Sequence, residues 1–286
     1  MKRTVVLSAV ALLGLFVPLM IAPTPGEATH PGPGGQIAFS RGPNDASDLY
    51  VVNPDGSRLQ RLTSAAGTER APSFSPDGQR LAFWSTDGER IWLMNADGTQ
   101  AAPATGRASS DAVAWSPDGR QFAYTDAGGI AILTLGGSAR RLAGTTGGDG
   151  EPAWSSRGQI AFRSVRDGNE EIYVVPADGP TPADPNVTKN PASDRDPNWS
   201  PDGGSLVFAS DRDGSRGIWG GPVGTFARWS SGASDFDPVF SPDGQRVAFE
   251  RGGDIYVINA RGGGEGRLTT GGSEWDYCTS PLASIT

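Results

Sequence analysis

Short apolar runs alternate with polar turns along most of the chain, and their order repeats. A typical unit begins with a run that ends in an aromatic residue, as in Val113–Trp115, and continues into a Ser-Pro-Asp-Gly turn. A second apolar run follows, such as Phe122–Tyr124, then another turn and a third run, such as Ile130–Ile132. Asp-Gly between apolar runs is a hairpin signal, because glycine accepts a positive φ angle without steric cost. The pattern predicts successive antiparallel strands.

The turns recur at a nearly constant spacing. Complete copies begin at Ser75, Ser116, Ser200 and Ser241, a degenerate copy begins at Ser155, and a remnant stands at Ser280. The successive spacings are 41, 39, 45, 41 and 39 residues. A period near 40 residues with several short strands in each unit is typical of a β-propeller blade. We therefore expect an all-β fold built from such blades.

The two ends of the repeat complement each other. The first unit starts at a second strand, Gln36–Phe39, and lacks a first strand, whereas residues Asp276–Pro281 align with the first strand of the other units. If this last segment joined the first unit, it would close the ring and remove open sheet edges. The sequence thus predicts a six-bladed β-propeller closed by strand exchange between the N- and C-terminal segments. Cys278 would lie in the closing strand as a small buried residue.

The N-terminus has the pattern of a secretory signal. Lys2 and Arg3 precede an apolar run over 5–22, and small residues stand before a cleavage point after Ala28. We expect a signal peptide over 1–28, a short leader over 29–34 and the propeller over 35–286. The alternative is an uncleaved anchor, because a run of about 18 residues approaches the length that spans a bilayer. Either reading places the propeller outside the cytoplasm, in the periplasm or secreted.

The composition excludes several kinds of function. Among 286 residues, Lys and Arg number 24 and Asp and Glu 32, for a net charge of -8, which argues against nucleic-acid binding. The single histidine, His30, precedes the first strand, so the propeller cannot build a Ser-His or Cys-His relay or a zinc site. No second long apolar run predicts a membrane span in the mature chain. We expect a monomer without a resident cofactor.

The motifs resemble a known family. The turn at Ser200–Gly203, the run Leu206–Phe208, the turn Asp211–Gly214 and the segment Glu171–Val174 are similar to the WD40-like repeat of the TolB β-propeller family. The resemblance covers about 245 residues and implies a six-bladed propeller closed by strand exchange. It also implies an envelope or extracellular protein or peptide as partner. TolB carries an α/β domain before its propeller, which the short leader leaves no room for, so the resemblance concerns fold and binding style more than pathway.

One pattern of carboxylates recurs with the repeat. Six residues before the turn serine stand Glu69, Asp149, Asp194, Asp235 and Glu274, and four residues before it stand Glu151, Asp196, Asp237 and Asp276. We call these the first tier and the second tier. Both tiers precede or enter the innermost strand of a blade, so ring symmetry would gather them at one mouth of the central channel. They could accept backbone N–H groups or arginines at blade junctions, or form an acidic funnel for Ca²⁺ or a basic partner segment.

Two functions remain open. The first is a non-catalytic scaffold that binds a protein or peptide through one face or the channel mouth. The alternative is a carboxylate-based or Ca²⁺-dependent hydrolase, similar to a glycosidase, with its site in the channel, since paired carboxylates suffice for that chemistry. A pair of carboxylates with strongly raised pKa values in an aromatic pocket would favour the enzyme.

Other recurrent residues are expected to be structural. The aspartate of each Pro-Asp-Gly turn should hydrogen-bond within its own turn. The aromatic residue that ends each first strand should pack between blades. Residues 184–191 account for the longest spacing and are expected to form a solvated loop at the outer edge.

Overall fold

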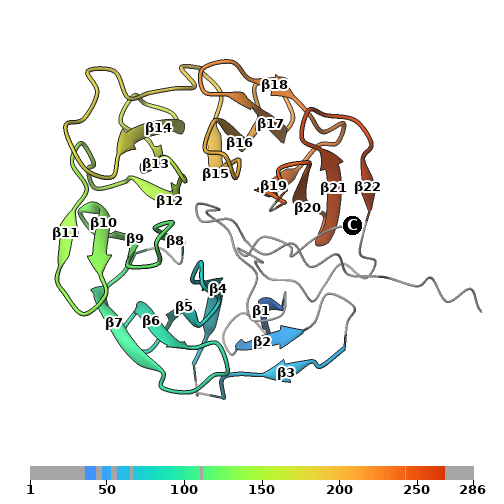
Figure 1. Ribbon diagram of the computed structural model, residues 1–286. Coiled ribbons are helices and arrows are strands. Elements are labelled where there is room, and N and C mark those ends of the chain that lie inside the picture. The colour runs from blue at the N-terminus through green and yellow to red at the C-terminus, as the bar shows by residue number, and fades with distance from the viewer. Residues whose placement is uncertain are drawn as a thin grey trace, which may run out of the picture.

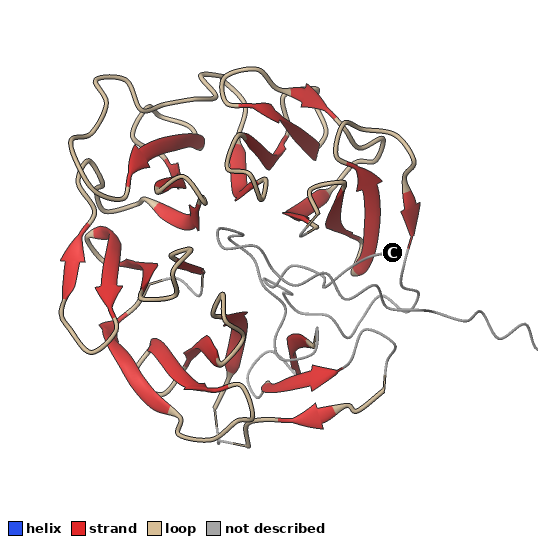
Figure 2. Cartoon of the chain, viewed as in Figure 1, coloured by secondary structure: helices blue, strands red, loops and turns tan. Residues whose placement is uncertain are grey.

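The chain folds into strands and turns arranged around a common centre (Figure 1). The computed structural model describes residues 36–42, 47–52, 57–64, 67–109, 112–241 and 243–267, and these contain six antiparallel sheets and no helix (Figure 2). The expectation of an all-β fold is confirmed. In the same ranges, no helix is long and apolar enough to cross a membrane.

The first three sheets cover the N-terminal half of the ring. The first sheet contains β1 (Ile37–Arg41), β2 (Asp48–Val52) and β3 (Gln60–Arg61). The second contains β4 (Glu69–Phe74), β5 (Arg80–Ser85), β6 (Arg90–Asn95) and β7 (Ala102–Arg107). The third contains β8 (Val113–Trp115), β9 (Gln121–Asp126), β10 (Gly129–Thr134) and β11 (Ala139–Arg141). Consecutive strands pair in each sheet.

The other three sheets continue the same order. The fourth contains β12 (Gly150–Trp154), β13 (Gln159–Ser164) and β14 (Glu171–Pro176), to which the following loop adds one bridge between Tyr173 and Asn186. The fifth contains β15 (Asp194–Trp199), β16 (Ser205–Ser210), β17 (Gly217–Pro222) and β18 (Ala227–Arg228). The sixth contains β19 (Asp235–Phe240), β20 (Arg246–Arg251), β21 (Asp254–Asn259) and β22 (Gly266–Arg267).

The first strand of each complete sheet lies nearest the centre. Figure 1 shows β4, β8, β12, β15 and β19 on the inner side of their sheets, and each of the first four contacts the innermost strand of the next sheet. Each of these strands ends at a Ser-Pro-Asp-Gly turn or its degenerate copy. The repeat therefore sets the turns at one end of the innermost strands and the candidate carboxylates toward the other end.

The turns are held by their own side chains, as expected. In the turn at Ser116, Asp118 Oδ1 accepts the serine hydroxyl at 2.7 Å and the N–H of Arg120 at 3.0 Å. These two bonds, the serine hydroxyl first, lower the pKa of the Asp118 carboxyl. Ser75, Ser200 and Ser241 bond the aspartates of their turns in the same way. The aspartate stabilises its turn, which confirms the expected structural role.

Successive turns also stack on one another. A Cβ placed on Gly244 would meet the Cδ of Pro201 at 3.4 Å, and one on Gly119 would meet the Cδ of Pro76 at 3.5 Å. Both glycines have positive φ angles, 67° and 66°. The positive φ angle is what requires glycine in these turns, and the proline of the preceding turn lies at van der Waals distance from it.

The core lies between neighbouring sheets. The aromatic residues that end the innermost strands are buried, as predicted; they are Phe74, Trp115, Trp154, Trp199 and Phe240. Two of these indoles also link adjacent sheets, because Trp115 Nε1 donates to the carbonyl of Ser73 and Trp199 Nε1 to that of Ala153, at 3.1 and 3.2 Å. Each of these two junctions is thus an apolar layer with one directional polar contact at its inner end.

The fifth sheet departs from the repeat in its third strand. By register, Gly220 and Gly221 of β17 occupy the positions of Leu93 and Met94 in β6. A Cβ on Gly220 would lie 2.6 Å from the indole of Trp229, so the indole fills the space that a side chain takes in other sheets. Trp229 packs edge-to-face on Phe240 of the sixth sheet, with ring centroids 6.0 Å apart. The volume of the tryptophan thus compensates for the missing side chain of Gly220.

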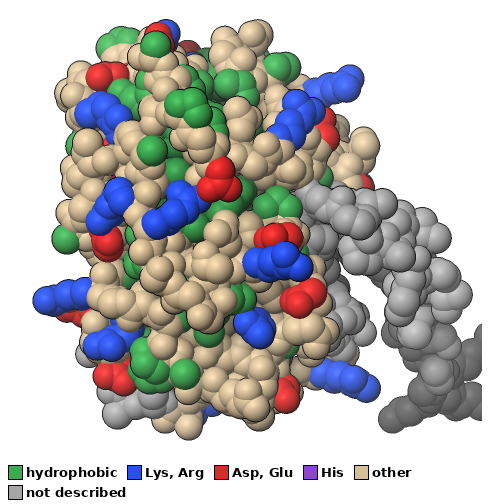
Figure 3. All heavy atoms as spheres, turned by 60° about the vertical axis from the view of Figure 1, so that its left-hand side comes forward, with side chains coloured by type: hydrophobic (Ala, Val, Ile, Leu, Met, Phe, Trp, Pro, Cys, Tyr) green, Lys and Arg blue, Asp and Glu red, His purple; other side chains and the backbone are tan. Residues whose placement is uncertain are grey.

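The outer surface is polar and mixed in charge. Figure 3 shows basic and acidic side chains interspersed over one side of the molecule, with apolar side chains between them. Several sequence predictions lie outside the described residues: the signal peptide over 1–28, the leader over 29–34, the closing strand over 276–281, Glu274, Asp276, Cys278 and His30. They stay predictions.

Candidate functional site

The described members of the first tier are buried. Glu69, Asp149, Asp194 and Asp235 are at most 2% exposed. Each aspartate meets an arginine that follows the second strand of its own sheet or ends it. Arg212 donates two bonds to Asp194 at 2.8 and 2.9 Å, and Arg251 donates two to Asp235 at 2.6 and 2.9 Å. Arg166 and Asp149 form the corresponding pair in the fourth sheet.

These arginines are themselves held by aromatic rings. The guanidinium carbons of Arg166, Arg212 and Arg251 lie 4.4 to 4.6 Å from the ring centroids of Tyr173, Trp219 and Tyr256. The aromatic residue belongs to the third strand of the same sheet. A planar guanidinium can donate a bidentate pair and stack on a ring at once, which lysine cannot do. The first tier is therefore a repeated carboxylate–arginine–aromatic unit inside each of these three sheets.

Glu69 is the exception in the first tier. Burial raises the pKa of its carboxyl, against hydrogen bonds from Thr63 and Ser85 that lower it. Burial also raises the pKa of Asp194, although Ser210 and Arg212 act in the opposite direction. The four described members of the first tier are thus buried carboxylates that bind side chains of the protein.

The second tier lies on an unusual backbone. The φ angles are 54° at Glu151, 55° at Asp196 and 47° at Asp237. Ala71, at the equivalent position of the second sheet, has a φ angle of 52°. Each of these four residues precedes a proline. The pairing of each innermost strand with its neighbour shifts at this point, which marks a β-bulge. A bulge redirects side chains and is common next to functional sites. Left-handed conformations of residues other than glycine cost about 1 kcal/mol each, and here they recur at one position of the repeat.

The carboxylates of the second tier connect one sheet to the next. Glu151 Oε2 accepts the backbone N–H of Asp196 at 2.9 Å, and the carboxylate of Asp196 accepts the backbone N–H of Asp237. These contacts join β12, β15 and β19. The carboxylates therefore form a ladder around the centre, which we call the acid ladder, in which each of these side chains holds the bulge of the following sheet.

Positive charge is supplied to one end of the acid ladder. Arg163 Nε lies 2.7 Å from Glu151 Oε1, and its Nη1 lies 3.4 Å from Glu170, which also binds Arg195. Asp196 has no guanidinium within ion-pair distance in the described part of the chain. Burial, followed by the charges of Asp237 and Glu151, raises the pKa of Asp196 well above its ordinary value. A proton on Asp196 would relieve that repulsion.

The ladder occupies only part of the ring. In the second and third sheets the same position holds Ala71 and Ala112. The described second-tier carboxylates therefore come from the fourth, fifth and sixth sheets. In the described ranges no three His, Cys, Asp or Glu side chains converge as ligands for a metal ion.

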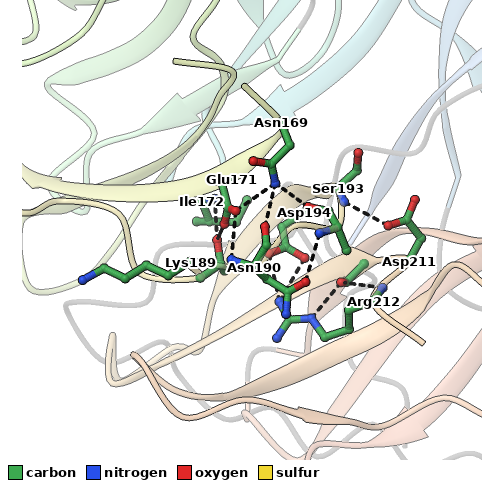
Figure 4. A network of polar contacts seen from close by, with 12 residues as sticks. Asn169, Glu171, Ile172, Lys189, Asn190, Ser193, Asp194, Asp211 and Arg212 are labelled. Atoms are coloured by element: carbon green, nitrogen blue, oxygen red, sulfur yellow. Dashed lines mark hydrogen bonds and ion pairs between the residues drawn. The ribbon is translucent and has the colours of Figure 1, made fainter. Parts of the chain in front are cut away.

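A separate polar network anchors the loop after β14. Buried Glu171 accepts hydrogen bonds from the Asn169 side chain at 2.8 Å, from the Asn190 N–H at 2.9 Å and from the Thr188 hydroxyl. Figure 4 shows this cluster beside the bidentate pair of Asp194 and Arg212. The loop expected over 184–191 is thus fastened to the fourth sheet by the buried Glu171 carboxylate and by backbone hydrogen bonds to β14.

Sequence reasoning missed the partners of these carboxylates. The arginines of the first tier follow or end the second strand in the segments Ser164–Arg166, Ser210–Arg212 and Glu250–Arg251. Two of these segments continue into Asp-Gly turns, so the sequence pattern indicates a turn there and gives no sign that the arginine binds a buried carboxylate. Two arginines next to the tiers in sequence have other contacts: Arg195 binds Glu170, and the guanidinium carbon of Arg70 lies 4.5 Å from the ring centroid of Trp84.

Comparison with known proteins gives the family. The sequence profile of the TolB beta propeller domain family, PD40, matches residues 20–131 and 112–227. The chain is 30% identical over 182 residues to a TolB homolog of Chlorobium luteolum, which covers 64% of this chain and 33% of that protein. A second TolB homolog, from Chlorobium chlorochromatii, is covered to 32%. The chain spans about a third of the length of these curated relatives.

Solved structures show the same fold. The putative TolB from Agrobacterium tumefaciens superposes with a TM-score of 0.70 at 22% identity, over 85% of this chain and 93% of that one. An oligogalacturonate lyase from Vibrio parahaemolyticus superposes with a TM-score of 0.62 at 11% identity, over 91% and 81%. Likeness at this identity concerns the fold alone. From the sequence profile, the repeated turns and the sheets around one centre, it follows that the chain belongs to the TolB beta propeller domain family.

Proposed function

We propose that this protein is a secreted or periplasmic, non-catalytic TolB-like propeller that binds a protein or peptide through the acid ladder. In this proposal the propeller has six blades, closed by strand exchange between residues 276–281 and the strand at Gln36–Ser40. The signal peptide is removed after Ala28, and the mature chain is a monomer. Its partner lies in the envelope or the extracellular space.

The crowding of Glu151, Asp196 and Asp237 carries the proposal. Three carboxylates lie on neighbouring innermost strands, and burial, followed by the charges of Asp237 and Glu151, raises the pKa of Asp196. A cationic side chain placed among them would replace the missing counter-charge. The first tier offers no such opportunity, because its aspartates already bind arginines of their own sheets. The second tier is therefore the favoured contact for a basic segment.

The test is a thermal-unfolding titration of the mature protein with a lysine-rich nonapeptide, and separately with Ca²⁺. A ligand that binds only the folded state raises Tm, by an amount that grows with its concentration. The triple variant Glu151→Gln, Asp196→Asn, Asp237→Asn should lose the shift and keep its fold. Asp178→Asn is the matched control, since Asp178 is exposed and its carboxylate binds only Arg140 in the described part of the chain. If neither ligand moves Tm of the parent protein, the acid ladder is not the binding site.

A carboxylate-based hydrolase is the alternative function. One observation favours it: Asp196 has a raised pKa next to Glu151, which the arginine Arg163 contacts. A protonated acid beside an ionised carboxylate is the pair that sugar hydrolysis uses. Under this alternative, the mature protein would cleave oligosaccharides with a bell-shaped pH profile, and Asp196→Asn would abolish the cleavage. Peptide binding without any turnover that depends on Asp196 would decide for the scaffold.

A further inference from the structure

A groove opens between the fifth and sixth sheets at the end of the ring that carries the Ser-Pro-Asp-Gly turns. Its volume is about 1050 Å³, within reach of an oligosaccharide or a short peptide. The floor contains Gly220, Gly221 and Trp229, and the walls include Asp243 and Arg261 of the sixth sheet. The acid ladder lies toward the opposite end of the innermost strands, so this groove is separate from the proposed site.

The groove is built by residues specific to this junction. The corresponding crevice between the second and third sheets has a volume of about 390 Å³. By register, Leu93 stands at the position of Gly220 and packs into that junction. It also has Leu135 where the sixth sheet has Ala260. The two positions are equivalent because the N–H of Leu135 donates to the carbonyl of Arg120 and the N–H of Ala260 donates to that of Gln245. Because the Trp229 indole fills the space over Gly220, the change from Leu135 to Ala260 is the one that accompanies the larger volume.

Several polar groups of the groove have no partner in the described part of the chain. The Arg261 guanidinium makes no hydrogen bond or ion pair there. Ser241 and Gln245 both bond Oδ1 of Asp243, which leaves Oδ2 without a bond in those residues. The hydroxyl of Thr225 and the indole N–H of Trp229, which also line the groove, likewise donate no bond within them. Donors and acceptors thus stand together over an aromatic floor.

The groove carries charges of both signs. Asp202, a further wall residue, lies 3.9 Å from the guanidinium of Arg157, and Asp243 stands on the same wall as Arg261. A ligand of one sign gains little from such an arrangement. A hydroxyl both donates and accepts, so it can satisfy a guanidinium and a carboxylate at once. The apolar faces of sugar rings can cover the tryptophan and the prolines Pro201 and Pro222 that line the groove.

We infer that this groove is a binding site for a neutral oligosaccharide. Isothermal titration of the mature protein with cellotetraose and with chitotetraose tests the inference. We expect saturable binding of one of them with a Kd of about 1 mM or below. Arg261→Gln removes the donor and should weaken binding about tenfold, equal to 1.4 kcal/mol. Ala260→Leu installs the residue of the smaller crevice and should abolish binding.

The control is Arg120→Gln, because Arg120 lines the smaller crevice and is likewise exposed. It should bind as the parent does. Tm of each variant shows whether the fold is kept, and Arg261→Gln, which breaks no contact among the described residues, stays informative if Ala260→Leu unfolds. Absence of binding of both tetrasaccharides overturns the inference. Binding that neither variant weakens would also overturn it. So would binding of a proline-rich peptide at the groove when neither tetrasaccharide binds there.

Discussion

Single carboxylates on one strand behave differently according to the groups that face them. Asp194 and Asp196 stand two residues apart on β15, and burial is the largest cause of a raised pKa at both. Asp194 receives two bonds from Arg212, whereas Asp196 faces the carboxylates of Glu151 and Asp237. The first is locked into its sheet. The second is available to respond to pH or to a cation.

The raised pKa of Asp196 predicts a pH-dependent stability. The Asp196 carboxyl holds its proton more firmly in the folded state than in the unfolded state. The free energy of unfolding therefore falls as pH rises from the unfolded pKa, about 3.9, to the higher pKa of the folded state. Asparagine cannot ionise and tolerates the left-handed conformation at this position. We expect Asp196→Asn to unfold at the parent's Tm at about pH 4 and above it at about pH 8. Equal differences at both pH values would contradict this, and Asp178→Asn should follow the parent throughout.

The buried pair of Asp194 and Arg212 predicts a large cost when one partner is removed. Arg212→Ala leaves a carboxylate that is 0% exposed without its counter-charge, which typically costs about 3–5 kcal/mol. Urea unfolding measures the loss. The double variant Asp194→Asn, Arg212→Ala removes the charge as well and should be more stable than the single variant. A double variant no better than Arg212→Ala would mean that the arginine acts by packing on Trp219 instead.

At the scale of elements, the fifth sheet shows how one repeat tolerates a change that the others lack. Gly220 and Trp229 exchange volume between β17 and the segment after β18, and Phe226 packs edge-to-face on Phe208 with ring centroids 4.8 Å apart. The sheet keeps its register between β16 and β17 throughout. At this junction a small residue on one strand is matched by a large residue nearby. A change of size at one position therefore requires the opposite change at the other.

This exchange predicts a coupled pair of substitutions. Gly220→Val should destabilise the protein by about 1–3 kcal/mol, because its side chain would collide with the indole of Trp229. Adding Trp229→Leu should restore most of that loss, since the pair then resembles the other sheets. Gly106→Val in β7 is the control, because a Cβ there meets nothing within 4 Å. Additive effects of the two substitutions in denaturant unfolding would refute the exchange.

The elements were predictable from the sequence to the extent that their signals are local. The Ser-Pro-Asp-Gly sequence contains the residues that form its turn, so it predicts the hairpins. It also marks the end of each innermost strand, which predicts that Trp115 and Trp199 are buried. The pairing of Asp235 with Arg251 joins residues 16 positions apart through a register that only the folded sheet defines. Neither the left-handed backbone of Asp237 nor the indole lying over Gly220 has a local signal. The different contacts of the two tiers could therefore be assigned only from the structure.

At the scale of the whole molecule, the ring is ordered by contacts between successive innermost strands. The strands β4, β8, β12, β15 and β19 contact one another in sequence order. The indole bonds and the acid ladder reinforce several of these junctions. Each sheet is therefore stabilised by its neighbours, and a missing junction would leave two sheets with uncovered faces.

Closure of the ring predicts the effect of a C-terminal truncation. Removing the chain from Trp275 onward should expose two sheet edges and lower Tm sharply, if residues 276–281 pair with the strand at Gln36–Ser40. Thermal unfolding of the truncated and complete mature proteins measures the difference. A truncation that ends after Ala283 is the control and should unfold as the parent does. An unchanged Tm in the first truncation would reject closure by strand exchange.

The uneven composition of the second tier has a consequence for orientation. Sheets related by a rotation offer a central partner several equivalent ways to dock, each turned by one sheet. Here Glu151, Asp196 and Asp237 stand on one side, whereas Ala71 and Ala112 hold the same position in the second and third sheets. The rotational equivalence is therefore broken, and a basic segment bound along the axis would have one preferred azimuth. A near-symmetric scaffold can in this way hold an asymmetric partner in a single pose.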